Sequence, residues 1–260
     1  MKIRVLNKTD SELKFLLEDS NPQFANALRR IMISEIPILA IDTVDFSLNG
    51  SVLYNEVIAH RLGLIPLTFD PKNFHFKSEH EDGKTCSMCE VVFALNKKGP
   101  TMVYSKDLKS SNPEVKPFYD DILIDELFED QKLKLEAAAS LGIAKNHARY
   151  QAALAFYRYF PVAKLKGKLD NAEEAVKVCP KNALKINGEK VDVTLDCDMC
   201  RECMKVAKPK GLLEITGDNT KFLFNVESVS ALKSEDIVFT SVSILKEKVK
   251  DFGKEVRKLK

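Results

Sequence analysis

The feature that most constrains the fold of this chain is the spacing of four cysteines between residues 179 and 203. Cys197, Cys200 and Cys203 follow one another at intervals of three residues, and Cys179, followed by Pro180, precedes them. Three thiolates at this spacing converge on one centre only if the backbone between them forms a tight loop, and a fourth ligand must come from elsewhere in the fold. The sequence therefore predicts a small module that folds around a metal centre.

These cysteines match one complete half of a double iron–sulfur pattern. Ferredoxins use a C-x2-C-x2-C-x3-C-P run twice, and the fourth cysteine of each run binds the cluster of the other run. When this pattern is laid on the sequence, one ligand set is complete and the positions of the other set are apolar. The second run departs from the pattern because its proline, Pro209, stands one residue late. The positions without ligands hold Leu169, Ala172, Ala175 and Ala207.

The complete donor set predicts one [4Fe–4S] cluster. A zinc ion on the same residues is one alternative, because four thiolates also suit tetrahedral zinc. Disulfides are another, because the cytosol of hyperthermophiles tolerates them. The predicted ligands are Cys179, Cys197, Cys200 and Cys203.

Cys86 and Cys89 form a second and weaker candidate site. A lone C-x2-C pair supplies half of a zinc site, and His75 or His80 in the adjacent polar loop are the candidates to complete it. A local disulfide or two free thiols is the preferred interpretation, because the loop offers no other type of ligand nearby.

Charge and composition exclude several classes of function. The 40 basic residues are nearly balanced by 38 acidic ones, so the chain lacks the strongly basic face of a nucleic-acid-binding protein. We find no phosphate-binding glycine loop, no paired carboxylates and no nucleophile–histidine spacing, so no catalytic residue is predicted. The absence of a signal peptide and of a long apolar run predicts a cytoplasmic protein.

Two distant segments, residues 23–35 and 233–260, carry apolar residues at helical spacing. Such a stripe is usually covered by the same chain, but two of them also fit a layer that pairs with a second chain. In the first segment the stripe is Phe24, Leu28 and Ile31. In the second it is Ile237, Ile244, Leu245, Val249, Phe252 and Val256.

The remaining pattern predicts strands, so the expected fold class is α+β. A hairpin is expected at the N-terminus and a β-rich region follows the first helix. Near the cysteines, residues 183–193 predict a strand–turn–strand with Asn187 and Gly188 at the turn, and residues 212–216 and 222–226 predict two further strands.

Two motifs resemble a known family. Residues 24–31 (FANALRRI) and 55–67 (NEVIAHRLGLIPL) are similar to the alpha-motif region of the alpha-type subunits of RNA polymerase. Residues 137–151 resemble the second-domain segment of that family, and residues 224–228 with the helix after them resemble its C-terminal dimerisation element. The resemblance covers nearly the whole chain, and a ferredoxin-like insertion distinguishes the archaeal members of the family from bacterial alpha.

The resemblance implies a non-catalytic assembly subunit of DNA-directed RNA polymerase. Such a subunit pairs with the smaller subunit L, and the heterodimer then docks the two large catalytic subunits, with small subunits N and P associated. The helical stripes would face subunit L. The surface facing the large subunits would contain Arg29, Arg30, Glu56, His60 and Arg61.

The resemblance also implies a domain organisation. An alpha-type dimerisation domain would comprise residues 1–40 and 221–260, with part of 150–166. An inserted β-rich domain would span 41–150, and a ferredoxin-like iron–sulfur domain 167–219. The competing hypothesis, an electron carrier fused to an oligomerisation domain, is disfavoured because the sequence contains no second redox site for onward transfer.

Overall fold

The computed structural model describes residues 1–79, 86 and 88–259, which fold into two compact units. Each unit is assembled from three separate stretches of the chain. The first unit contains Met1–Asn7, Lys14–Asn26 and Phe156–Asn225. The second unit contains Lys8–Leu13, Ala27–Ala155 and Val226–Lys260.

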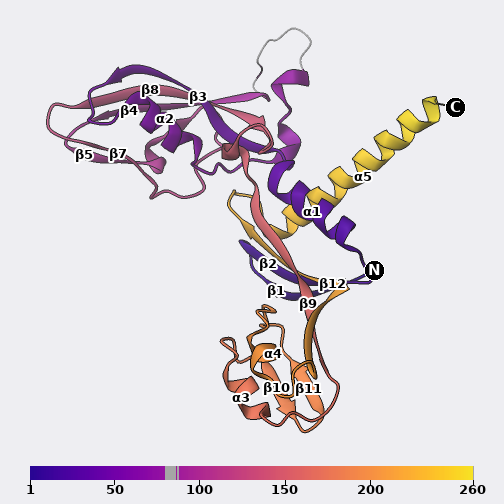
Figure 1. Ribbon diagram of the computed structural model, residues 1–260. Helices are drawn as coiled ribbons and strands as arrows, with labels where there is room; N and C mark the ends of the chain where they lie inside the picture. Colours follow the sequence, from indigo (N-terminus) through magenta and orange to yellow (C-terminus); the bar gives the residue numbers. More distant parts are fainter. Residues whose placement is uncertain (80–85, 87, 260) are drawn as a thin grey trace. The chain divides into compact units, whose positions relative to one another are not determined.

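The first unit is built on an antiparallel sheet with strand order β1-β2-β12-β9 (Figure 1). Its buried face is aromatic: the rings of Phe15 and Phe224 stack with centroids 4.9 Å apart, and Tyr157 meets the edge of Phe222 at 5.4 Å. The sheet comprises β1 (Lys2–Lys8), β2 (Glu12–Glu18), β9 (Ala153–Leu165) and β12 (Leu213–Ser228).

Strand β12 replaces two strands that the sequence predicted as separate, and strand β9 was not predicted. Residues 212–216 and 222–226 belong to one continuous strand, because the polar stretch between them stays extended instead of turning. The predicted N-terminal hairpin is confirmed as β1 and β2.

A small module lies between β9 and β12 in the chain. Two short helices flank a hairpin, whose turn contains Gly188 at a φ of 62°, a conformation that glycine adopts without steric cost. Asn171 joins the helices, since its side chain donates to Val206 O at 3.0 Å and accepts from Lys208 N at 2.8 Å. The module contains α3 (Ala172–Lys177), β10 (Leu184–Asn187), β11 (Lys190–Val193) and α4 (Glu202–Val206).

The second unit contains a sheet of order β3-β8-β4-β6 and a two-stranded β5-β7 ribbon. Strand β4 shows why the region folds this way: Val91, Phe93 and Leu95 alternate with exposed residues and point into the core. Helix α2 packs on β3 through Ile58 and Leu62. The elements are β3 (Ile38–Asn49), α2 (Asn55–Gly63), β4 (Glu90–Lys98), β5 (Thr101–Tyr104), β6 (Lys109–Ser110), β7 (Leu123–Leu127) and β8 (Lys132–Gly142). Short 3-10 helices occur at Pro71–Asn73, Lys77–Glu79, Ser105–Asp107 and Ala148–Tyr150.

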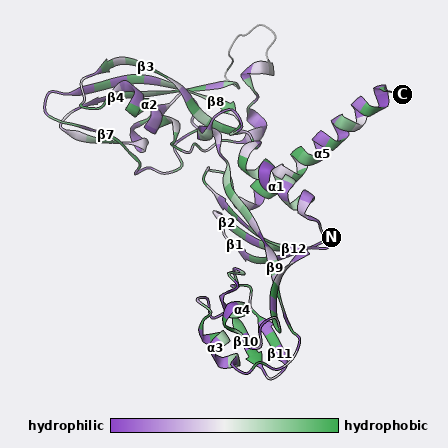
Figure 2. Ribbon diagram, viewed as in Figure 1, coloured by the Kyte–Doolittle hydropathy of each residue, from purple (hydrophilic) through white to green (hydrophobic). Residues whose placement is uncertain are grey.

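Two longer helices complete the described chain, α1 (Pro22–Ser34) and α5 (Ser234–Lys258). Asn21 caps α1, because its side-chain oxygen accepts from the Phe24 N–H at 2.8 Å. An ion pair joins Lys248 of α5 to Glu35, just after α1. Figure 2 shows hydrophobic and hydrophilic bands alternating along α5. None of the described helices combines the length and apolar character that a membrane crossing requires. The mixed α and β content with several antiparallel sheets agrees with the predicted class.

Candidate metal centre and partner surfaces

The four predicted ligands line one small cavity in the first unit. Cys179 lies just beyond α3, Cys197 and Cys200 lie in the loop between β11 and α4, and Cys203 lies within α4. The structure thus brings together four thiols that are up to 24 residues apart (203 minus 179) in the sequence. Apolar walls complete the cavity: Leu184, Val193 and Ile215.

The loop that carries three of these cysteines has an unusual backbone. Met199 and Arg201 both adopt left-handed conformations, with φ of 58° and 65°. Such conformations are costly for residues other than glycine and cluster at functional sites. Within the loop, the Cys200 N–H donates to the Asp198 carboxylate at 3.2 Å. The bend of the loop around the cavity therefore comes with backbone strain at Met199 and Arg201.

The electrostatics of the cavity disfavour free thiolates. Burial raises the pKa of the Cys197 thiol, and the neighbouring thiols Cys179 and Cys200 raise it further. Burial also raises the pKa of Cys203, again reinforced by the other three thiols. Ionising all four would concentrate negative charge in a partly buried space, and a metal centre supplies the compensating positive charge. The Ala183 N–H donates to Cys179 Sγ at 3.3 Å, a type of contact that stabilises bound thiolate.

The positions without ligands are occupied by packed apolar side chains. Leu169, Ala175 and Ala207 are at most 4% exposed, and Ala172 packs against the same cluster. These residues form the core of the module together with Leu213 and Ile215. A second cluster has no space or donors here, so the chain can hold at most one in this module.

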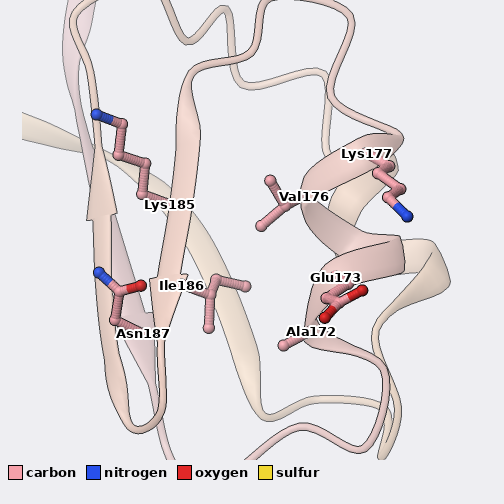
Figure 3. Close-up of a pocket in the computed structure, with 7 residues that line it drawn as sticks. All are labelled: Ala172, Glu173, Val176, Lys177, Lys185, Ile186 and Asn187. Atoms are coloured by element: carbon pink, nitrogen blue, oxygen red, sulfur yellow. The ribbon is translucent and has the colours of Figure 1, made fainter.

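A groove on the other side of α3 has no such donors. Figure 3 shows it between α3 and β10, where Val176 and Ile186 face each other across the gap. No cysteine or histidine lines it. Its lining residues are Ala172, Glu173, Val176, Lys177, Lys185, Ile186 and Asn187.

The structure brings Cys86 and Cys89 together with His75. The two Sγ atoms are 3.3 Å apart, and Cys86 Sγ lies 3.6 Å from His75 Nε2. A hydrogen bond with Cys89 is the largest of the effects that lower the pKa of Cys86. All three ligand atoms lie within 4.8 Å of one another, which is the spacing for a single ion. His80, the other predicted completion, lies outside the described residues.

The apolar stripe on α1 is mostly buried. Leu28 and Ile31 are each only 3% exposed in this chain, and their contact with subunit L stays a prediction. A stripe at helical spacing shows that one face is buried but not which chain buries it. Phe24 and Arg29 are half-buried and Arg30 is exposed.

The predicted contact residues of α2 are on the surface. Glu56, His60 and Arg61 are exposed, and the Arg61 guanidinium also donates to Ile124 O at 2.8 Å. This hydrogen bond fixes Arg61 against β7.

The exposed apolar row on α5 lies further towards the C-terminus than the predicted one. Val249 and Phe252 are exposed as expected, with 72% of Phe252 accessible, whereas Ile244 and Leu245 are half-buried and Ile237 is buried. Apolar residues alternate at spacings of three and four, which is the heptad pattern of paired helices. We refer to this row as the α5 seam: Val242, Leu245, Val249, Phe252, Val256 and Leu259. Leu259 was missed because the predicted stripe ended at Val256. Extending the same spacing by three more residues would have included it.

This chain is similar to known proteins over nearly its whole length. The RNA polymerase Rpb3/RpoA insert domain matches residues 40–162. DNA-directed RNA polymerase subunit Rpo3 of Methanosphaera stadtmanae is 36% identical over 258 residues, covering 95% of this chain and 96% of the relative. The proteins of the same name from Archaeoglobus fulgidus and Pyrococcus furiosus are 35% and 34% identical, covering 99% and 100% of this chain and 98% of each relative.

Proposed function

Since the chain belongs to the Rpo3 family of DNA-directed RNA polymerase subunits, we propose how this non-catalytic assembly subunit recruits its partners. The α5 seam receives a second polymerase subunit, the smaller alpha-like subunit L. The exposed face of α2, together with Arg29 and Arg30 of α1, then contacts a large catalytic subunit, and small subunits N and P join the platform. The residues proposed for the second contact are Arg29, Arg30, Glu56, His60 and Arg61.

The observation that carries this proposal is the exposure of the α5 seam. Phe252 and Leu259 are 72% and 85% exposed, and Val249 is 63% exposed. Large apolar side chains aligned on one face of a helix are unfavourable in water and mark a partner surface. The heptad spacing specifies the partner element as another helix. Obligate interfaces are large and apolar, as this seam requires.

Substitutions in the seam test the proposal. Phe252→Glu places a charge in the predicted helix interface and is expected to weaken pairing with subunit L by roughly two orders of magnitude. Lys250→Glu introduces the same side chain two residues away, off the seam, and is expected to leave pairing nearly unchanged. Both variants would be co-purified with tagged subunit L and titrated by calorimetry. Equal affinities for the two variants would reject the α5 seam as the interface.

We also propose that residues 167–219 form a ferredoxin-like module that holds one [4Fe–4S] cluster. The convergence of the four cysteines on one cavity and the Ala183 N–H that donates to Cys179 Sγ support it. When bound, the cluster would cross-link three segments of the module through its four thiolates. Iron and sulfide analysis with visible spectroscopy on anaerobically purified protein tests this. Zinc in place of iron, or oxidised cysteines, would contradict the cluster.

The alternative of an electron carrier gains no support. The relatives match this chain over nearly its full length and are named polymerase subunits.

A further inference from the structure

One side chain outside the cysteine module contacts the loop that carries three of its thiols. Arg158 lies in β9, 39 residues before Cys197. Its guanidinium donates from Nη2 to Leu195 O at 2.5 Å and from Nη1 towards Cys197 O at 3.4 Å. The side chain is half-buried beside the loop. Arg158 thus binds two backbone carbonyls of the loop that carries Cys197 and Cys200.

The loop also packs directly on the long strands. A Cβ atom placed on Gly217 of β12 would lie 2.5 Å from Tyr159 Cβ and 3.3 Å from Met199 Sδ. Only glycine allows this close approach of β12, β9 and the loop. In addition, the Ile215 N–H of β12 points to Sδ of Met204 in α4 at 3.3 Å. The cysteine loop and the helix after it are therefore held to β9 and β12 by several independent contacts, of which Arg158 makes the polar ones to the loop backbone.

We propose that Arg158 is a positioning residue for the metal centre, an inference that rests on the metal site proposed above. A planar guanidinium can fix two carbonyls at once, because its donors project in a rigid fork. Fixing the carbonyls of Leu195 and Cys197 directs the Cys197 thiol into the cavity before a metal binds. A loop ordered in advance loses less conformational entropy on binding.

The proposal implies that the centre and β9 are coupled. If the contacts of Arg158 favour metal binding, metal binding must favour those contacts by the same factor. Loss of the metal should therefore loosen β9 around residue 158.

The test compares full-length wild type, Arg158→Ala and Arg158→Lys, with Lys164→Ala as the matched control. Lys164 is an exposed cation on the same strand with no contact to the loop among the hydrogen bonds and ion pairs of the described chain. Each protein is reconstituted anaerobically with ferrous iron and sulfide and then challenged with an iron chelator, and the loss of visible absorption is followed. We expect release from Arg158→Ala to be roughly tenfold faster than from wild type, because two hydrogen bonds to a charged donor are lost. Arg158→Lys should be intermediate and Lys164→Ala unchanged.

A second readout separates positioning from general stability. In the metal-free proteins, alkylation of Cys197 should accelerate in Arg158→Ala while Cys179, which Arg158 does not contact, keeps its rate. Equal release rates for wild type and Arg158→Ala would overturn the proposal, as would equal acceleration at both cysteines. If wild type takes up no iron, the proposed cluster fails instead, and the alkylation pattern still decides the role of Arg158.

Discussion

At the scale of the residue, the second unit contains an ion pair that should make its stability sensitive to acid. Burial acts to raise the pKa of Asp107, but hydrogen bonds from Lys97 and from the Tyr104 N–H outweigh it and hold the pKa below its usual value. A carboxylate with a lowered pKa contributes stability above its unfolded pKa of about 3.9, and this contribution is lost as the pH falls through the folded pKa.

Asp107→Asn should therefore destabilise the protein by about 1 kcal/mol at pH 7, and the difference should shrink as the pH falls below about 3.9 and through the folded pKa of Asp107. Urea unfolding at pH 7 and at a series of pH values below about 3.9 measures it. Asp121→Asn, at an exposed position, serves as the control. A difference that stays constant throughout the acid series would show that the charge of Asp107 is not responsible.

The group His75, Cys86 and Cys89 gives a second prediction at this scale. Its spacing suits one zinc ion, whereas the Sγ separation of 3.3 Å exceeds the disulfide bond length of about 2.05 Å. We expect zinc to bind there, and His75→Ala to lower the zinc content by one ion per chain while His60→Ala leaves it unchanged. Native mass spectrometry measures both. A wild-type mass that shows a Cys86–Cys89 disulfide and no zinc would support the interpretation preferred from sequence.

At the scale of the element, the cysteine module should depend on its metal. Cys200 is exposed whereas Cys203 is buried, so Cys200→Ser removes a ligand with little loss of packing. Because metal–thiolate bonds contribute folding free energy in small modules, this variant should disorder residues 167–219. Pairing with subunit L should persist, since the α5 seam lies in the other unit.

Amide hydrogen exchange measures this effect, with Cys86→Ser controlling for the loss of a thiol elsewhere. Loss of subunit pairing in Cys200→Ser would show that the module and the α5 seam are not independent.

The elements also show what the sequence could and could not predict. The helices α1, α2 and α5 were found because apolar spacing is a local signal, whereas the short helices α3 and α4 were missed. The four cysteines that line one cavity were found because their spacing is a chemical signal. Strand β9 was missed because its aromatic run, including Tyr157 and Phe160, has no simple alternation. The role of Arg158 has no local signal, since its partners are 37 and 39 residues away. The burial of Leu28 and Ile31 depends on tertiary packing, which periodicity alone does not reveal.

At the scale of the whole molecule, the chain is a polymerase subunit in which the proposed partner surfaces and the cysteine cavity are distinct features. The α5 seam and the exposed face of α2 belong to the second unit, whereas the cysteine cavity belongs to the first. A subunit of this kind contributes surfaces rather than reacting groups. Its central requirement is a second chain that covers the apolar residues of α5.

Sedimentation of the purified chain, alone and mixed with subunit L, tests this requirement most directly. We predict a stable one-to-one heterodimer whose formation removes Phe252 and Leu259 from solvent. A chain that stays monomeric in the mixture, with no measurable affinity for the smaller subunit, would contradict the account.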